Sequence, residues 1–128
     1  MVIDSSAAIE MLLRKPRAEG LIRRIEDGAV VHAPHLIDVE VAHALRRFVL
    51  RGELGPGRAA SALILWRQFK IERHAHGPFL ERIWRLRANV TAYDAAYVAL
   101  AEALGTTLVT ADRRLARAPG VSVPVEAL

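Results

Sequence analysis

TAYDAAYVALAEALGTTLVTAD, residues 91–112, predicts a buried helix followed directly by a buried strand. Thr91 is a favourable N-cap, alanine and leucine fill the interior, and Gly105 stands where a helix commonly ends. Apolar residues occupy almost every side of this helix, which is typical of a helix inside a protein. Asp94 in the first turn and Asp112 after the strand therefore place two carboxylates in apolar surroundings.

The remaining chain alternates short apolar strands with helices, a pattern typical of an α/β fold with a mostly parallel sheet. Ser5 and Ser6 are suited to cap the first helix, and Pro124 suits a strand at the edge of a sheet. No linker, repeat or low-complexity segment interrupts residues 1–128, so we expect a single domain. The expected strands are 1–4, 29–33, 70–74, 107–110 and 121–125, and the expected helices are 7–13, 17–27, 36–50, 58–69, 77–87 and 91–105.

The composition is basic, with 18 Lys and Arg against 14 Asp and Glu and a formal net charge of +4. Only Lys15 and Lys70 are lysines, and arginine binds phosphate and stacks on bases, which suits a nucleic-acid partner. A coding bias towards arginine explains the same composition, so charge alone does not decide. The absence of cysteine excludes disulfides, thiolate zinc sites and thiol catalysis. Without a leader or a long apolar run, we expect a soluble, cytoplasmic protein.

Four acidic residues are predicted where strands end or helices begin, and we call them the acidic quartet: Asp4, Glu40, Asp94 and Asp112. Asp4 follows the first strand and Asp112 follows the strand at 107–110, whereas Glu40 and Asp94 lie one turn into helices. Sites in such sheets lie beyond the carboxyl ends of the strands. If these helices start at the same edge of the sheet, the four side chains converge.

A convergent cluster of acids needs a counter-charge. Two carboxylates about 4 Å apart repel by about 4 kcal/mol at an effective dielectric constant of about 20, unless one is protonated or a divalent cation lies between them. Carboxylate, hydroxyl and water ligands without cysteine suit Mg²⁺ or Mn²⁺. Such an ion can orient a phosphodiester and activate water. Ser5 and Thr110 supply hydroxyls at the same strand ends.

Each member of the acidic quartet also has a local structural explanation. Asp4 can cap the first helix, and Asp94 can complete a variant of the capping box with Thr91. Glu40 can be an acid favoured by the helix dipole on a solvated face, and Asp112 can be a turn or cap residue. What these explanations do not account for is the joint placement of the four at one expected edge.

Several other kinds of site are disfavoured by the spacing of their residues. No HxxxH or HExxH arrangement lies on one helix, which argues against a zinc site. No GxxxxGK[ST] loop, GxGxxG turn or GxSxG elbow occurs, which removes common nucleotide-binding and serine-hydrolase functions. The histidines concerned are His32, His35, His43, His74 and His76.

Taken together, the motifs resemble the PIN domain and, more narrowly, the VapC-type toxins of bacterial toxin–antitoxin pairs. The resemblance rests on VIDSSA at 2–7, Glu40 early in its helix, TAYDAAY at 91–97 and LVTAD at 108–112. It covers the whole chain in order and length, and TAYDAAY and LVTAD together are its specific part. It implies a three-layer α/β sandwich, with a short, mostly parallel sheet of four to five strands flanked by helices.

The resemblance implies a Mg²⁺- or Mn²⁺-dependent endoribonuclease in which the acidic quartet holds metal and activates water. Thr110 matches the hydroxyl that the family places beside the metal, and Ser5 is expected to assist. The resemblance also implies a homodimer and a cognate antitoxin, whose C-terminal segment lies in a groove between helices and blocks the site. Transfer RNA is the family-level expectation for the RNA substrate.

One departure from the family pattern lies directly after Asp112. Some members carry a further acid there, whereas this chain has Arg113 and Arg114. The sequence therefore lacks that ligand for a second metal ion, and an active state with one ion, completed by substrate phosphate, is compatible with it.

Five arginines are candidates to hold the RNA backbone, although a solvated helix face is the simpler explanation for each: Arg46, Arg47, Arg113, Arg114 and Arg117. Tyr93 and Tyr97 stand four residues apart on one helix, and we expect both in the core rather than stacked on bases. The same expectation applies to Trp66 and Trp84.

Two other functions remain open at this point. One is a non-catalytic PIN-like module, which would bind RNA or a protein partner equally well with and without EDTA and would not cleave RNA. A phosphatase with Asp4 as nucleophile normally has a second acid two residues further on, where this chain has Ser6, and no lysine is suitably placed.

Overall fold

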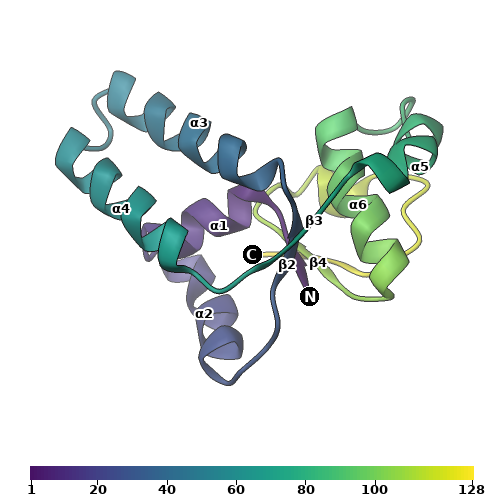
Figure 1. Cartoon of the computed structure of the whole chain (residues 1–128), viewed down its shortest axis with the longest axis horizontal. Helices are drawn as coiled ribbons and strands as arrows, with labels where there is room; N and C mark the ends of the chain where they lie inside the picture. The colour runs from purple at the N-terminus through teal and green to yellow at the C-terminus, as the bar shows by residue number, and fades with distance from the viewer.

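In the computed structural model, which describes residues 1–128, five short strands form one parallel sheet in the order β3-β2-β1-β4-β5 (Figure 1). All four neighbouring pairs run parallel, and Ile3 of the central strand is in register with Val109 of the next. The strands are β1 (Val2–Ile3), β2 (His32–Pro34), β3 (Glu72–His74), β4 (Leu108–Thr110) and β5 (Val125–Ala127).

Helices cover both faces of this sheet and make the predicted three layers. One layer contains α1, α3 and α4, which contact one another, and the other contains α5 and α6, with α6 packed on β1, β2 and β4. Figure 1 shows α3 and α4 as one arm and α5 and α6 as the other. The helices are α1 (Ser5–Leu12), α2 (Glu19–Glu26), α3 (Ile37–Leu50), α4 (Pro56–Gln68), α5 (Leu80–Arg85) and α6 (Ala92–Leu104).

Helix α6 is the most completely buried helix, as its composition predicts. Every residue from 95 to 101 is buried. Thr91 caps the helix, since its side chain accepts the Asp94 N–H, and Gly105 ends it in the left-handed region at φ 59°. A left-handed residue favours glycine because a Cβ is strained there. The prediction made from residues 91–112 is therefore confirmed at both ends of the helix.

The structure corrects several element boundaries. Strand β2 includes Pro34, which was expected to stop it, and the last strand is β5 rather than 121–125. Pro124 precedes β5 and offers its carbonyl to Leu108, because proline can accept a ladder hydrogen bond but cannot donate one. The first helix is capped by Asp4 rather than by Ser5 or Ser6.

Two expected helices each begin with a short 3₁₀ turn. Pro16–Ala18 precedes α2, and Gly77–Phe79 precedes α5. A proline lies in both turns, where its missing N–H and fixed φ favour the start of a helix. None of the helices is both long enough and apolar enough to span a membrane.

Candidate active site

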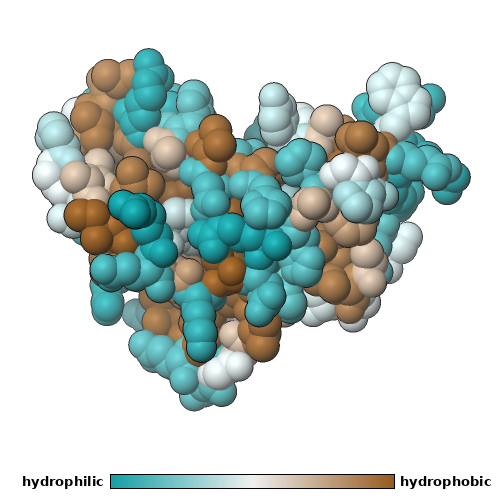
Figure 2. Space-filling view, in the orientation of Figure 1, coloured by the Kyte–Doolittle hydropathy of each residue, from teal (hydrophilic) through white to brown (hydrophobic).

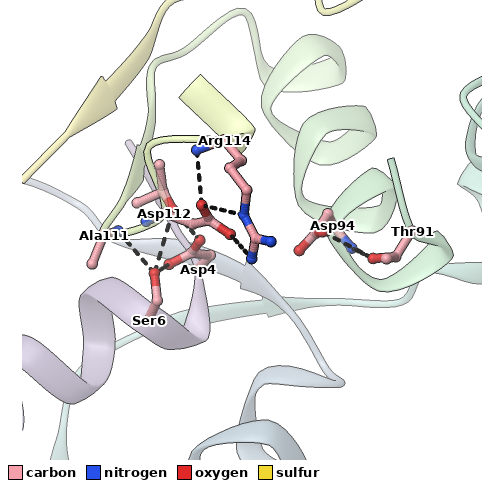
Figure 3. A network of polar contacts seen from close by, with 8 residues as sticks. Asp4, Ser6, Thr91, Asp94, Ala111, Asp112 and Arg114 are labelled. Atoms are coloured by element: carbon pink, nitrogen blue, oxygen red, sulfur yellow. Dashed lines mark hydrogen bonds and ion pairs between the residues drawn. The ribbon is translucent and has the colours of Figure 1, made fainter. Parts of the chain in front are cut away.

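The acidic quartet gathers at the carboxyl edge of the sheet, where the sequence predicted that it would. Asp4 comes directly after β1, and Asp112 follows β4, the strand paired with β1. Glu40 and Asp94 both lie in first helical turns, of α3 and α6. The fold therefore brings acids from distant parts of the chain to one place, and Figure 3 shows Asp4, Asp94 and Asp112 around it.

Asp4 is the buried member of the acidic quartet, with 5% of its surface exposed. Its Oδ1 accepts hydrogen bonds from the Ser6 hydroxyl at 2.7 Å and from the Ala7 N–H at 2.8 Å. Its Oδ2 accepts the hydroxyl of Thr110. Burial raises the pKa of Asp4, the hydrogen bonds oppose that rise, and the charge of Asp94 adds to it. Asp4 is therefore both the N-cap of α1 and a fixed carboxylate.

Ser6 is a part of this site that sequence reasoning missed. Its Oγ lies 3.3 Å from Thr110 Oγ1 and accepts the Ala111 N–H at 2.8 Å, in addition to bonding Asp4. It thus joins the start of α1 to the end of β4 (Figure 3). Ser5, the hydroxyl predicted to assist, lines a hollow together with Glu40. The signal available in the sequence was the second of two adjacent serines after Asp4.

Glu40 is joined to α6 through Tyr97. The Tyr97 hydroxyl donates a hydrogen bond to Glu40 Oε2. Burial raises the pKa of Glu40, the bond from Tyr97 lowers it, and the charges of Asp4 and Asp94 raise it further. Burial also raises the pKa of the Tyr97 hydroxyl, so it stays a proton donor. Tyr97 is a core residue, as predicted, but its polar end reaches the site, which the sequence did not reveal.

Asp94 is held by its own helix cap. The Thr91 hydroxyl donates to Asp94 Oδ2 at 2.9 Å, and the Asp94 N–H donates to Thr91 Oγ1 at 3.1 Å. This exchange is the Thr91–Asp94 capping arrangement considered from the sequence. Figure 3 shows that the Asp94 carboxylate nevertheless points towards Asp112 and Arg114, and its charge raises the pKa of both Asp4 and Glu40.

Asp112 forms an ion pair with Arg114. Its Oδ1 accepts the Arg114 backbone N–H at 2.8 Å, and its Oδ2 lies 3.2 Å from Arg114 Nη2. These contacts lower the pKa of Asp112. The Asp112 N–H in turn donates to Thr110 Oγ1 at 2.9 Å. Figure 3 shows the Arg114 guanidinium between Asp112 and Asp94.

A hollow lies on each side of the acidic quartet. The larger, about 590 Å³, is the α6-side groove, whose charged lining residues are Arg87, Asp94, Asp112, Arg114 and Arg117. The other, about 440 Å³, is the α3-side groove, lined by Ser5, Val39, Glu40, His43, Ala44, Arg47 and Tyr93. The acids therefore stand between two grooves that both carry arginine.

The donor set of the site suits a hard cation that keeps part of its water shell. Its oxygen donors are the four carboxylates with the hydroxyls of Ser6 and Thr110, and no soft ligand is present. No three His, Asp or Glu side chains are arranged to hold one ion directly. Mg²⁺ typically takes one or two carboxylates and fills the remaining positions with water and phosphate. The residues present fit that mode of binding.

The arginines and aromatic residues that the sequence singled out lie partly in the two grooves and partly outside them. Arg114 and Arg117 line the α6-side groove and Arg47 lines the α3-side groove. Trp66 is buried as expected, whereas Trp84 and Tyr93 are 68% and 66% exposed, so the prediction that they lie in the core is wrong. Arg46 and Arg113 line neither groove. Arg87, which the sequence did not single out, lies over the Trp84 ring at 4.8 Å.

Comparisons with known proteins find relatives over nearly the whole chain. The PIN domain family model matches residues 1–121. Ribonuclease VapC9 of Mycobacterium tuberculosis is 43% identical over 125 residues, covering 98% of this chain and 95% of the relative. Ribonuclease VapC1 of the same organism is 42% identical over 126 residues, with the same coverage of both chains.

Two solved structures share the fold at low sequence identity. PAE2754 from Pyrobaculum aerophilum superposes with a TM-score of 0.72 at 23% identity, covering 98% of this chain and 81% of the other. VapBC2 from Rickettsia felis, solved bound to a DNA fragment from its promoter, has a TM-score of 0.72 at 12% identity, covering 99% and 97%.

Proposed function

Because this chain belongs to the PIN-domain family and is a VapC ribonuclease, the toxin of a VapBC toxin–antitoxin system, we propose that its acidic quartet is the active site. The proposed reaction is hydrolysis of an RNA phosphodiester bond with the help of Mg²⁺ or Mn²⁺. The observation that carries it is the gathering of four carboxylates at the carboxyl edge of the sheet. Two of them, Asp4 and Glu40, have pKa values raised by burial and by neighbouring acids.

Each acid has a distinct part in the proposed mechanism. Asp4 is a fixed ligand, because three hydrogen bonds hold both of its oxygens. Asp94 approaches from α6, and Asp112 comes from beyond β4. Glu40, bonded by Tyr97, is suited to accept the proton of the attacking water because burial raises its pKa and so makes the carboxylate a better base. When bound, a divalent ion supplies orientation of the phosphodiester and neutralisation of charge developing on phosphorus.

The RNA strand is proposed to follow the two grooves across the acids. Arg87 and Arg117 in the α6-side groove and Arg47 in the α3-side groove offer guanidinium groups for phosphate oxygens. The exposed Trp84 ring beside Arg87 offers a face on which a base can stack. Transfer RNA is the proposed substrate class, and sequencing the ends of RNAs cut after expression would identify the target.

A cognate antitoxin is proposed to bind in the groove between α3 and α4. An apolar hollow of about 290 Å³ lies between these helices. Figure 2 shows apolar surface gathered on this arm of the molecule. The hydrophobic residues that line the hollow are Ala42, Leu45, Val49, Leu50, Pro56, Ala59, Ala60 and Leu63.

We also propose a homodimer, which light scattering of the purified chain would detect.

Substitution of one quartet member tests the active site directly. Asp94→Asn keeps the size of the side chain and is expected to lower Mg²⁺-dependent cleavage of an RNA pool by more than about a hundredfold, since residues that merely support a metal ligand already cost about 10- to 100-fold. Asp27→Asn, the same change at an exposed acid outside the site, is the control. EDTA should stop cleavage and added Mg²⁺ or Mn²⁺ should restore it. Undiminished cleavage by a folded Asp94→Asn protein would refute the assignment.

A further inference from the structure

Arg114 is the one arginine that forms an ion pair with a member of the acidic quartet. It contacts Asp112 three times, from its backbone N–H at 2.8 Å, from Nε at 3.4 Å and from Nη2 at 3.2 Å. The pKa of the Arg114 guanidinium is raised, first by Asp112 and further by the charge of Asp94. The guanidinium therefore lies in the field of two acids that come from different elements, as Figure 3 shows.

The ion pair between Arg114 and Asp112 is exposed to solvent and therefore weak. The Arg114 side chain is 93% exposed and that of Asp112 is 38% exposed. An ion pair so open to solvent contributes little net stability, because water and salt screen it and ordering a long side chain costs entropy. By contrast, Asp4 is buried and fully hydrogen-bonded. The site thus combines one fixed carboxylate with another whose partner can leave readily.

The position of Arg114 also meets an electrostatic need of the site. Carboxylates gathered at one edge repel one another unless a positive charge stands among them. Without a divalent ion, the Arg114 guanidinium supplies that charge between Asp112 and Asp94. A divalent ion held by the same acids would compete with the guanidinium, because both cations are attracted to the same carboxylates and repel each other.

We propose that Arg114 is a displaceable internal cation, which pairs with Asp112 in the metal-free site and is released into the α6-side groove when a divalent ion binds. This inference rests on the proposed function, since it assumes that the acidic quartet holds the ion. Released, the guanidinium remains in the groove that Arg87 and Arg117 also line. Arg114 thus competes with the metal ion for Asp112.

Metal affinity tests the proposal without relying on catalysis. Mn²⁺ binding, followed by the paramagnetic resonance of the free ion, is compared among the unaltered chain, Arg114→Gln and Arg113→Gln. Both substitutions remove one positive charge from adjacent exposed positions, but only Arg114 contacts an acid. Removal of an exposed competing ion pair is expected to tighten Mn²⁺ binding about two- to fivefold in Arg114→Gln relative to Arg113→Gln.

A second measurement follows the guanidinium itself. In ¹⁵N NMR spectra, the Arg114 Nε–H signal, assigned by its absence in Arg114→Gln, is expected to move to the position of a free arginine as Mg²⁺ is added. Equal Mn²⁺ affinity in the two glutamine variants, or an Arg114 signal that stays in place at saturating Mg²⁺, would overturn the proposal. Asp94→Asn distinguishes the other failure: Mn²⁺ binding that does not depend on Asp94 would overturn the proposed function, and this inference with it.

Discussion

The Tyr97 hydroxyl donates a hydrogen bond to the Glu40 carboxylate and so joins α6 to α3 across the site. The two helices belong to opposite layers of the sandwich, and the bond links them close to their first turns, which carry Glu40 and Asp94. It holds down the pKa of Glu40, which burial and two neighbouring acids would otherwise raise further. One tyrosine therefore serves the packing of α6 and the charge state of the site.

Tyr97→Phe is expected to lower the free energy of unfolding by about 1–3 kcal/mol, because a buried hydrogen bond to a charged group is lost while the ring still fills the core. The pKa of Glu40 should rise, since the bond that lowers it is gone. Urea denaturation measures the stability. Tyr93→Phe is the matched control on the same helix, because the Tyr93 ring is exposed. Equal stability of the two variants would contradict the role of the bond.

Asp4 should make the metal-free protein less stable as the pH rises. The folded-state pKa of Asp4 is raised, mainly by burial, so folding disfavours its ionised form. Its contribution is most favourable below the unfolded pKa of about 3.9 and declines as the pH rises through the folded pKa. In EDTA, the melting temperature of Asp4→Asn minus that of the unaltered chain should therefore increase from acid to neutral pH. A difference that does not change with pH would contradict this.

Glu102 gives a pH dependence of the opposite sign. It accepts two hydrogen bonds from Arg82, at 2.7 and 2.8 Å, and a third from the Ser122 N–H at 3.0 Å. Arg82 lowers the pKa of Glu102, so the contribution to stability is complete above the unfolded pKa of about 4.3 and is lost as the pH falls through the folded pKa.

Glu102→Gln is expected to cost about 1–2 kcal/mol at neutral pH, where charge-assisted bonds that tie α6 to α5 are lost, and much less in acid. Thermal melts at several pH values measure the difference. Glu81→Gln breaks the exposed pair with Arg85 and serves as the control, with an expected cost of at most about 0.5 kcal/mol. A cost for Glu102→Gln that persists unchanged in acid would refute the assignment to its charge.

The α6-side groove makes a separate prediction about RNA. Arg87→Gln and Arg117→Gln should each raise KM several-fold and change kcat little, because they remove phosphate contacts that exist before and during the reaction. The salt dependence of binding should also become less steep in each variant. Arg23→Gln on α2, which lines neither groove, is the control. A lower kcat at constant KM would place these arginines in the chemical step instead.

The sequence was most informative where several local signals indicate the same element. The cap at Thr91, the left-handed Gly105 and the unbroken apolar interior of α6 all pointed to the same helix, and the structure has it. The convergence of the acids was expected because the carboxyl ends of parallel strands lie at one edge of a sheet, and the sheet is parallel. Neither prediction required knowledge of how individual side chains meet.

What the sequence could not reveal depends on contacts between distant residues. The bond between Tyr97 and Glu40 spans 57 positions, and that between Ser6 and Ala111 spans 105. Trp84 was expected in the core rather than as a base-stacking platform, yet it lies exposed beside Arg87. The short final strand begins after Pro124, which accepts a hydrogen bond from the Leu108 N–H but has no N–H of its own to donate.

Asp4 caps the first helix and belongs to the acidic quartet, and a single side-chain conformation serves both roles. Its carboxylate is oriented by the Ala7 N–H and by the hydroxyls of Ser6 and Thr110 as soon as the chain has folded. The Asp4 carboxylate is thus already immobile before an ion binds. The entropy cost of fixing its orientation falls on folding and not on ion binding. Lengthening the side chain by a single methylene, as in Asp4→Glu, would spoil the helix start and the ligand geometry together.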